Sequence, residues 1–410
     1  MWNRRGGSRS HVRLAGLCQL TIQIALVIGC TAARAENGTG QSDATRWPGL
    51  GVTGYHASPA WQHVAVQLVT DAGSTVWIVS LASEEVVWQP PADDTWTWWA
   101  GPWLDDETLI VTRSPDELPG AYGVYLDECK AFGGHMEPAA VDGLWAEDRY
   151  QLRQGTDGRW RLSPLPELSY TYHCFLSRVG LQGRRLGYTV QPYSWMPVRL
   201  YLHDLETHGT QLLAETGPAT DVYLLAGTSV GARYAELTTY SSKADVDETY
   251  SIMDLSTGAL TPFGRPAGTV HVPWVSLDAS RVAWFREDKP RGVVVQNLRA
   301  PQDEPLLFSF RLGDYGSLQW SDTGRRLACG CRRPQRIHTM NLGDGTVRSF
   351  RVPDRFGDVL GLRWKDDTTL VCRASGLPST LQALDTESGQ WNELLRLRLG
   401  STQAAPDAAK

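Results

Sequence analysis

The sequence predicts an all-β protein, a β-propeller of eight or alternatively seven four-stranded antiparallel blades, over residues 49–400. Three observations predict this fold. A tryptophan signature repeats along the chain, a second signature follows it in most units, and helical periodicity is nearly absent. The 17 tryptophans, 40 glycines and 23 prolines suit an all-β chain with many turns and large aromatic cores. A chain of hairpins that closes on itself protects its sheet edges best as a propeller.

The first signature is a tryptophan followed by an acidic turn and a short apolar strand. Trp103 and Trp364 begin two clear copies and are separated by six steps of about 43 residues, the length of one propeller blade. The unit at Trp145 is short, so seven blades remain if it belongs to a loop. The eight units are residues 58–64, 103–109, 145–150, 179–186, 227–234, 275–282, 320–327 and 364–370.

The second signature is an alternating apolar stretch that ends in Asp or Asn and then Leu. Glycine-containing turns follow it. The order strand, acidic turn, strand, strand, glycine turn, strand is the plan of an antiparallel meander. Copies of this signature are residues 200–205, 252–255, 295–298 and 339–342.

A small residue recurs near the start of the strand after each acidic turn. Space between propeller blades is tightest near the axis, so a small residue at one fixed strand position favours close stacking of sheets. The residues are Ala65, Gly187, Ala235, Ala283 and Ala328.

These repeats resemble the WD-like propeller repeats of TolB-type periplasmic proteins, in which Trp-Ser-Pro-Asp-Gly precedes a strand. Residues 320–328 are the nearest copy, without the proline, and the resemblance covers about residues 50–397. It implies a propeller that binds a protein or ligand through one face, and it supplies no catalytic residue.

The N-terminus has the order of an export signal. Basic residues precede the uncharged segment 14–29, and small residues lead to an Ala33-Arg34-Ala35 cleavage site, which defines a signal peptide over residues 1–35. Residues 27–30 resemble a lipobox, which would make Cys30 the lipidated N-terminus instead. An uncleaved anchor is a third alternative, because residues 14–33 carry no charge before Arg34.

All three alternatives place the body outside the cytoplasm, in the periplasm or on the cell surface. Membrane contact is then expected only through the N-terminal lipid or anchor. Residues 36–48 are polar and glycine-rich and predict a flexible tether, and residues 401–410 predict a disordered tail.

Charge argues against a nucleic-acid partner. The formal charge is −6, from 39 basic and 45 acidic residues, whereas a general nucleic-acid binder needs a basic surface. Short acidic runs such as Asp366-Asp367 are better explained as solvated turns than as a cation site.

No catalytic, cofactor-binding or metal-binding residue is predicted. Residues 227–231 match the G-x-S-x-G nucleophile elbow at Ser229, but the following residues alternate as a strand where the elbow needs a helix. The spacing of the histidines, including His203 and His208, fits no metal motif, and exposed turns explain these two.

Cysteines in the body are expected mainly as buried thiols. Cys329 and Cys372 occupy matching positions in two units, too far apart to bridge, and Cys329-Gly330-Cys331 lacks the second ligand pair of a zinc site. Cys129 and Cys174 are the more plausible disulfide pair.

The densest aromatic run contains Trp96, Trp98 and Trp99. These side chains are candidate binding aromatics that could stack on sugar rings or anchor a protein, and packing between blades is the alternative, favoured explanation. The predicted function is a non-catalytic binding or scaffold module for a protein partner in the cell envelope, with carbohydrate as an alternative ligand. The competing hypothesis is a hydrolase or lyase acting on glycans, with its site in the central channel.

Overall fold

The structure is a computed structural model. It describes residues 51–70, 73–91, 96–115, 148–168, 176–180, 184–190, 197–217, 220–239, 248–270, 273–310, 315–332 and 335–397. The predicted signal peptide, Cys30, the tether 36–48 and the tail 401–410 lie outside these residues.

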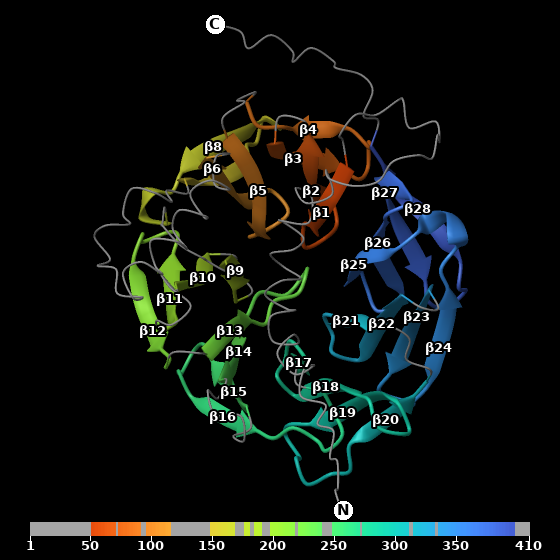
Figure 1. The fold of residues 1–410 in the computed structure, drawn as a ribbon. Helices are drawn as coiled ribbons and strands as arrows, with labels where there is room; N and C mark the ends of the chain where they lie inside the picture. Colours follow the sequence, from red (N-terminus) through yellow and green to blue (C-terminus); the bar gives the residue numbers. More distant parts are fainter. Residues whose placement is uncertain are drawn as a thin grey trace, which may run out of the picture.

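Seven four-stranded antiparallel sheets surround a central axis as the blades of a propeller (Figure 1). Each sheet contains four strands that are consecutive in sequence, and the first strand of each blade is innermost. Blade 1 contains β1 (Gly51–Ala57), β2 (His63–Thr70), β3 (Gly73–Ser80) and β4 (Val86–Trp88). Blade 2 contains β5 (Trp96–Trp103), β6 (Thr108–Pro115), β7 (Asp148–Gln154) and β8 (Trp160–Pro164), followed by the short 3-10 helix η3 (Pro166–Leu168).

The other five blades follow the same order. Blade 3 contains β9 (Leu176–Val179), β10 (Arg185–Val190), β11 (Arg199–Asp204) and β12 (Thr210–Glu215). Blade 4 contains β13 (Thr220–Leu224), β14 (Tyr234–Thr239), β15 (Thr249–Asp254) and β16 (Leu260–Phe263). Blade 5 contains β17 (Trp274–Val275), β18 (Arg281–Arg286), β19 (Gly292–Asn297) and β20 (Leu306–Ser309). Blade 6 contains β21 (Tyr315–Trp320), β22 (Arg326–Arg332), β23 (Gln335–Asn341) and β24 (Val347–Arg351), followed by the 3-10 helix η4 (Asp354–Phe356). Blade 7 contains β25 (Val359–Trp364), β26 (Thr369–Ala374), β27 (Leu377–Asp385) and β28 (Trp391–Arg396).

The number of blades is seven, so the prediction of eight is replaced by its stated alternative. The unit predicted at Trp145 is not a blade of its own. Its strand is β7, which pairs with β6 through Val111 and Tyr150 and is the third strand of blade 2. Residues 116–147 connect these two strands, and this long connection reproduces the spacing of an extra blade.

The small residues predicted between stacked sheets lie where the blades approach closely. Ala65, Ala235, Ala283 and Ala328 are fully buried on the second strands of their blades. At Gly187, an added Cβ would lie 2.8 Å from Val179 and 2.9 Å from Leu224 of the next blade. A larger side chain at these positions would push neighbouring sheets apart, which confirms the packing argument.

Tryptophans of the first signature join three blades to the blade before them. The indole N–H of Trp103 donates to the His56 carbonyl at 2.8 Å. Trp320 donates to Trp274 O at 2.8 Å, and Trp364 donates to Gln319 O at 2.9 Å. The repeated residue therefore contributes both a buried ring and a hydrogen bond between inner strands.

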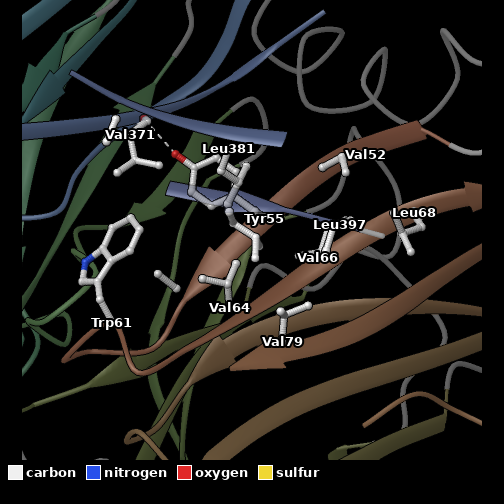
Figure 2. Close-up of a cluster of buried hydrophobic side chains, with 13 residues drawn as sticks. Val52, Tyr55, Trp61, Val64, Val66, Leu68, Val79, Val371, Leu381 and Leu397 are labelled. Carbon is white, nitrogen blue, oxygen red and sulfur yellow. Dashed lines mark hydrogen bonds between the residues drawn. The ribbon is translucent and has the colours of Figure 1, made fainter. Parts of the chain in front are cut away.

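Side-chain contacts between blades 1 and 7 close the ring, because each blade supplies all of its own strands. The Tyr55 hydroxyl lies 2.7 Å from Gly361 O and 2.9 Å from Val371 O, both on blade 7 (Figure 2). Around it, Val52, Val64 and Val66 of blade 1 pack with Leu381 and Leu397 of blade 7. This cluster takes the place of a strand shared between the chain ends.

The up-and-down order of the strands gives the propeller two distinct faces. The connections between first and second strands and between third and fourth strands lie on one face, which we call the turn-bearing face. The first strand of each blade begins, and the fourth ends, on the opposite face. The described chain therefore enters at Gly51 and leaves after Arg396 on the face opposite the turns. Among the described residues, no helix combines the length and apolar character needed to cross a bilayer.

Candidate functional site

A pocket of about 160 Å³ lies at the end of the ring axis on the turn-bearing face. Blades 4 to 7 line it with the last residues of their inner strands and the first residues of the turns that follow. Leu224, Leu277 and Leu318 supply apolar surface, while Asp322 and Arg363 supply charge. The Arg363 guanidinium also donates to Gln319 Oε1 at 3.4 Å.

The turn of blade 4 reaches across this end of the propeller. It spans residues 225–233, whereas the corresponding turns of blades 6 and 7 span residues 321–325 and 365–368. In Figure 1 the green segment between β13 and β14 extends to the middle of the ring. The Ser229 backbone N–H donates to Asp322 Oδ2 of blade 6 at 2.7 Å, and the Ser229 hydroxyl donates to the same oxygen. Blade 4 thus contacts blade 6 directly.

Gly227 is required by this close approach. An added Cβ at Gly227 would collide with the carboxylate of Asp322 and would lie 2.5 Å from Leu277. The absence of a side chain lets the backbone of the turn pass over the carboxylate.

A buried arginine holds the other side of the blade 4 turn. Arg178 on β9 is 5% exposed, and its guanidinium donates to Leu104 O of blade 2 at 3.1 Å and Thr228 O of blade 4 at 3.4 Å. Burial lowers the pKa of the Arg178 guanidinium, and the carboxylates of Asp322, Asp105 and Asp106 oppose that effect. Arg178 therefore ties the turns of three adjacent blades together from beneath the surface.

Hydrogen bonds link other inner turns in the same way. The Ala60 N–H donates to Asp106 Oδ1 at 2.8 Å, joining blades 1 and 2. Arg281 donates to Gly324 O at 3.0 Å, and the Thr323 hydroxyl donates to Asp367 Oδ1 at 2.6 Å, joining blades 5, 6 and 7. A surface held in this way is ordered before any ligand arrives, which lowers the entropic cost of binding.

Carboxylates of the outer turns hold the backbone locally. The backbone N–H groups of Thr207 and Glu206 donate to Asp204 and lower the pKa of its carboxyl group. Those of Ser388 and Glu387 do the same at Asp385. These contacts agree with the prediction that the acidic residues serve as turn residues.

Exposed aliphatic side chains recur at the edge of the turn-bearing face. Each is the first residue of a fourth strand, opposite a buried residue of the third strand, such as Met253 opposite Leu260 and Met340 opposite Val347. We call this set the apolar rim: Val86, Leu260, Leu306 and Val347, which are 43%, 56%, 47% and 37% exposed.

The predicted binding aromatics lie on β5 of blade 2. Trp98 is buried and packs against Trp88 of blade 1 and Tyr150 of its own blade. Trp99 is half-buried, and its indole donates to Ser114 Oγ at 3.2 Å. The Trp96 side chain lies outside the described part of the structure. The three rings thus form no single described surface.

The G-x-S-x-G match at Ser229 is not a nucleophile elbow. It is followed by the strand β14, as the alternation predicts, and the Ser229 hydroxyl donates to a carboxylate instead of an imidazole. Asp322 of blade 6 accepts from this hydroxyl, so the hydroxyl does not face only solvent. The assignment of His203 to an exposed turn is wrong. His203 is fully buried on β11, with Nδ1 2.9 Å from Thr210 Oγ1.

The described cysteines Cys329, Cys331 and Cys372 are buried thiols, as expected. Cys129 and Cys174 lie outside the described residues. Within the described residues, no three His, Cys, Asp or Glu side chains form a group that could hold a metal ion.

Sequence reasoning missed Arg178 and Asp322 as the residues that organise this end of the axis. Arg178 bonds Leu104, 74 residues away in the chain, and Asp322 bonds Ser229, 93 residues away. No local sequence motif predicts contacts at such separations. The one available signal is the greater length of the blade 4 turn.

Comparisons with known proteins identify the fold. No protein-family model matches the chain, and no curated protein matches it by sequence. Among solved structures, the chain is similar to the β-propeller domain of the Trilobed protease from Pyrococcus furiosus, described as having an open velcro topology. The two share 10% identity with a TM-score of 0.56, and the match covers 86% of this chain and 98% of that one.

Two further structures match more loosely. TolB from Acinetobacter baumannii shares 12% identity at a TM-score of 0.41, over 72% of this chain and 79% of TolB. Sqt1 from Saccharomyces cerevisiae shares 13% identity at a TM-score of 0.48, over 85% and 86%. The seven four-stranded sheets make this chain a β-propeller, the fold that its resemblance to WD-like repeats implies.

Proposed function

We propose that this chain is an exported, non-catalytic β-propeller that binds another protein of the cell envelope through its turn-bearing face. The apolar rim is the observation that carries the proposal. Leu260, Leu306 and Val347 repeat one exposed position on three consecutive blades, and Val86 repeats it on blade 1. A partner that spans several blades would bury these four aliphatic side chains together, and the burial of apolar area supplies affinity.

Charge on the inner turns defines the complementary partner surface. Asp105, Asp106 and Glu107 of blade 2 and Asp366 and Asp367 of blade 7 lie on the inner turns of the two blades that flank blade 1 on this face. Opposite charges on a partner would guide its approach and fix its orientation, while aliphatic contacts at the edge supply affinity. The partner surface we propose has basic side chains at its centre and apolar side chains around them.

The position of the chain entry supports this use of the face. The described chain enters at Gly51 on the face opposite the turns. With the lipid at Cys30 or an N-terminal anchor, the tether 36–48 would join the membrane to the opposite face and leave the turn-bearing face uncovered. A partner in the envelope then reaches it without obstruction.

The rim is tested by replacing three of its residues together, as Leu260→Glu, Leu306→Glu and Val347→Glu. The control is Leu212→Glu, because Leu212 is 48% exposed but lies within β12, away from the turns. The wild type, the triple variant and the Leu212→Glu control are each expressed in the source organism, cross-linked and purified. We expect one protein to be cross-linked to the wild type and the Leu212→Glu control, and to be absent from the triple variant. Equal recovery with all three proteins would overturn the proposal.

A further inference from the structure

Two thiols lie in contact on one face of a strand in blade 6. Cys329 and Cys331 are two residues apart on β22, so their side chains point to the same side of the sheet. Their sulfur atoms are 3.9 Å apart, and both side chains are buried between blades 5 and 6. Two residues of an extended strand span roughly 6.6 Å between Cα atoms. Disulfides form at Cα separations of about 4.4–6.8 Å, so a slight contraction of the strand brings the pair into range.

The residue between them permits such a contraction. Gly330 has no positive φ, and an added Cβ there would meet nothing within 4 Å. The conformation described here therefore does not require a glycine. Glycine within a strand weakens it, because it adds backbone freedom and packs no side chain. Glycine at this position therefore leaves β22 free to bend between the two cysteines.

The neighbouring strand is already irregular at the same level. Tyr315 pairs with Cys331 and Leu318 pairs with Cys329, so β21 places two residues opposite Gly330 alone. This bulge interrupts the ladder of hydrogen bonds beside the two cysteines. Bending of β22 at Gly330 therefore breaks little regular pairing with β21.

We propose that Cys329 and Cys331 are a modification site, where a disulfide oxidant converts the two thiols into an intrastrand disulfide. The Cys331 thiolate attacks one sulfur of the oxidant and forms a mixed disulfide with it, while the other half of the oxidant leaves as a thiolate and takes up a proton. The Cys329 thiolate then attacks Cys331 Sγ and releases the second half of the oxidant, also as a thiol. Two protein thiols are oxidised and one oxidant disulfide is reduced.

Burial determines when the exchange takes place. The neighbouring Cys331 thiol and burial raise the pKa of Cys329, so its thiolate is scarce in the folded protein. Oxidation is therefore fast while β22 is still forming, or during local opening, and slow in the closed propeller.

Blade 7 supplies an internal control. Cys372 occupies on β26 the position that Cys329 occupies on β22, and Ala374 stands where blade 6 has Cys331. Cys372 is buried like Cys329, but it has no second thiol two residues along the strand. It should remain a thiol under the same treatment.

The test uses the full chain, unfolded and refolded with oxidised glutathione and an excess of reduced glutathione, which returns a cysteine without a partner thiol to its reduced form. The protein is then alkylated and digested with trypsin without reduction. Cleavage after Arg326 and Arg332 isolates residues 327–332 with both cysteines, and cleavage after Lys365 and Arg373 isolates residues 366–373 with Cys372. We expect peptide 327–332 to be unalkylated and two hydrogen atoms lighter than its dithiol, and peptide 366–373 to carry one alkyl group. In Cys331→Ala, which copies blade 7, Cys329 should be alkylated.

Two alkyl groups on peptide 327–332, or glutathione retained on either cysteine, would overturn the proposal. The same digest of protein oxidised without unfolding provides a second measurement, in which the disulfide should appear more slowly. Neither measurement depends on export or on a partner, so a negative result leaves the proposed function standing.

Discussion

Ser229 of blade 4 and Asp322 of blade 6 are joined across the end of the propeller axis, with the Ser229 N–H 2.7 Å from Asp322 Oδ2. Blade 5 lies between them in sequence and in the ring. The contact makes the turn of residues 225–233 a bridge over the pocket, and Arg178 holds the same turn from blade 3. The turn-bearing face is consequently one ordered surface.

Asp322→Ala should release this bridge. The change removes the acceptor of both Ser229 hydrogen bonds, and we expect unfolding free energy to fall by about 1–2 kcal/mol. Hydrogen exchange should rise within residues 225–233. Asp344→Ala is the control, because Asp344 bonds Thr346 within its own turn. Unchanged exchange in residues 225–233 of the Asp322 variant would show that the bridge is absent in solution.

Tyr55→Phe should weaken ring closure. It removes the hydroxyl shared by Gly361 O and Val371 O, and leaves buried acceptors on blade 7 without that donor. We expect a loss of about 1–3 kcal/mol in urea denaturation. Tyr223→Phe removes a hydroxyl that bonds Asp221 within blade 4 and should cost less. An equal loss in the two variants would contradict a special role for the closure contact.

Glu236 should make stability depend on pH. It is 5% exposed on β14, and burial raises the pKa of its carboxyl group to about 8, with Asp221 adding to the rise. The folded protein therefore keeps this proton between about pH 4.5 and 8, where the unfolded chain loses it. Stability contributed by the protonated carboxyl is present below that range and is lost as pH rises through it.

Glu236→Gln should remove this part of the pH dependence. The wild type should lose up to about 1.4 kcal/mol per pH unit relative to the variant across that range. Denaturation measured from pH 5 to 9 supplies the comparison. Parallel stability curves for the two proteins would show that Glu236 is already ionised in the folded state.

The sequence allowed the propeller and the order of strands within a blade to be predicted, because these features repeat along the chain, and five blades also repeat the small packing residue. Repetition also explains the errors. Trp145 follows Trp103 by 42 residues, close to the length of one blade, so the pattern counts it as an extra unit although its strand completes blade 2.

The candidate site is formed by features that the blades do not share, so the repeat pattern could not predict it. Residues 227–234 match the repeat like the other units, and this match does not reveal that their turn is longer and crosses the axis to Asp322. Arg178 resembles any strand arginine in sequence, and its burial follows from three turns meeting above it. Contacts of this kind depend on ring closure, which local patterns do not encode.

The N-terminal prediction can be tested in cells. With lipidation at Cys30, Cys30→Ala should move the protein out of the membrane fraction or stall its maturation. Fractionation combined with mass spectrometry of the N-terminal peptide separates the alternatives. An unchanged distribution with a mature terminus at Glu36 would identify Ala35 as the cleavage point.

The central claim, that the turn-bearing face binds a protein, is tested most directly by cross-linking from single positions in living cells. A photoreactive amino acid is placed at Leu260 in the apolar rim and, in a separate protein, at Leu212 within β12. Both positions are comparably exposed, so their reactivity toward passing molecules should be similar. We predict one cross-linked species of defined mass from position 260 and none of that mass from position 212. The same species from both positions, or none from position 260, would contradict the account.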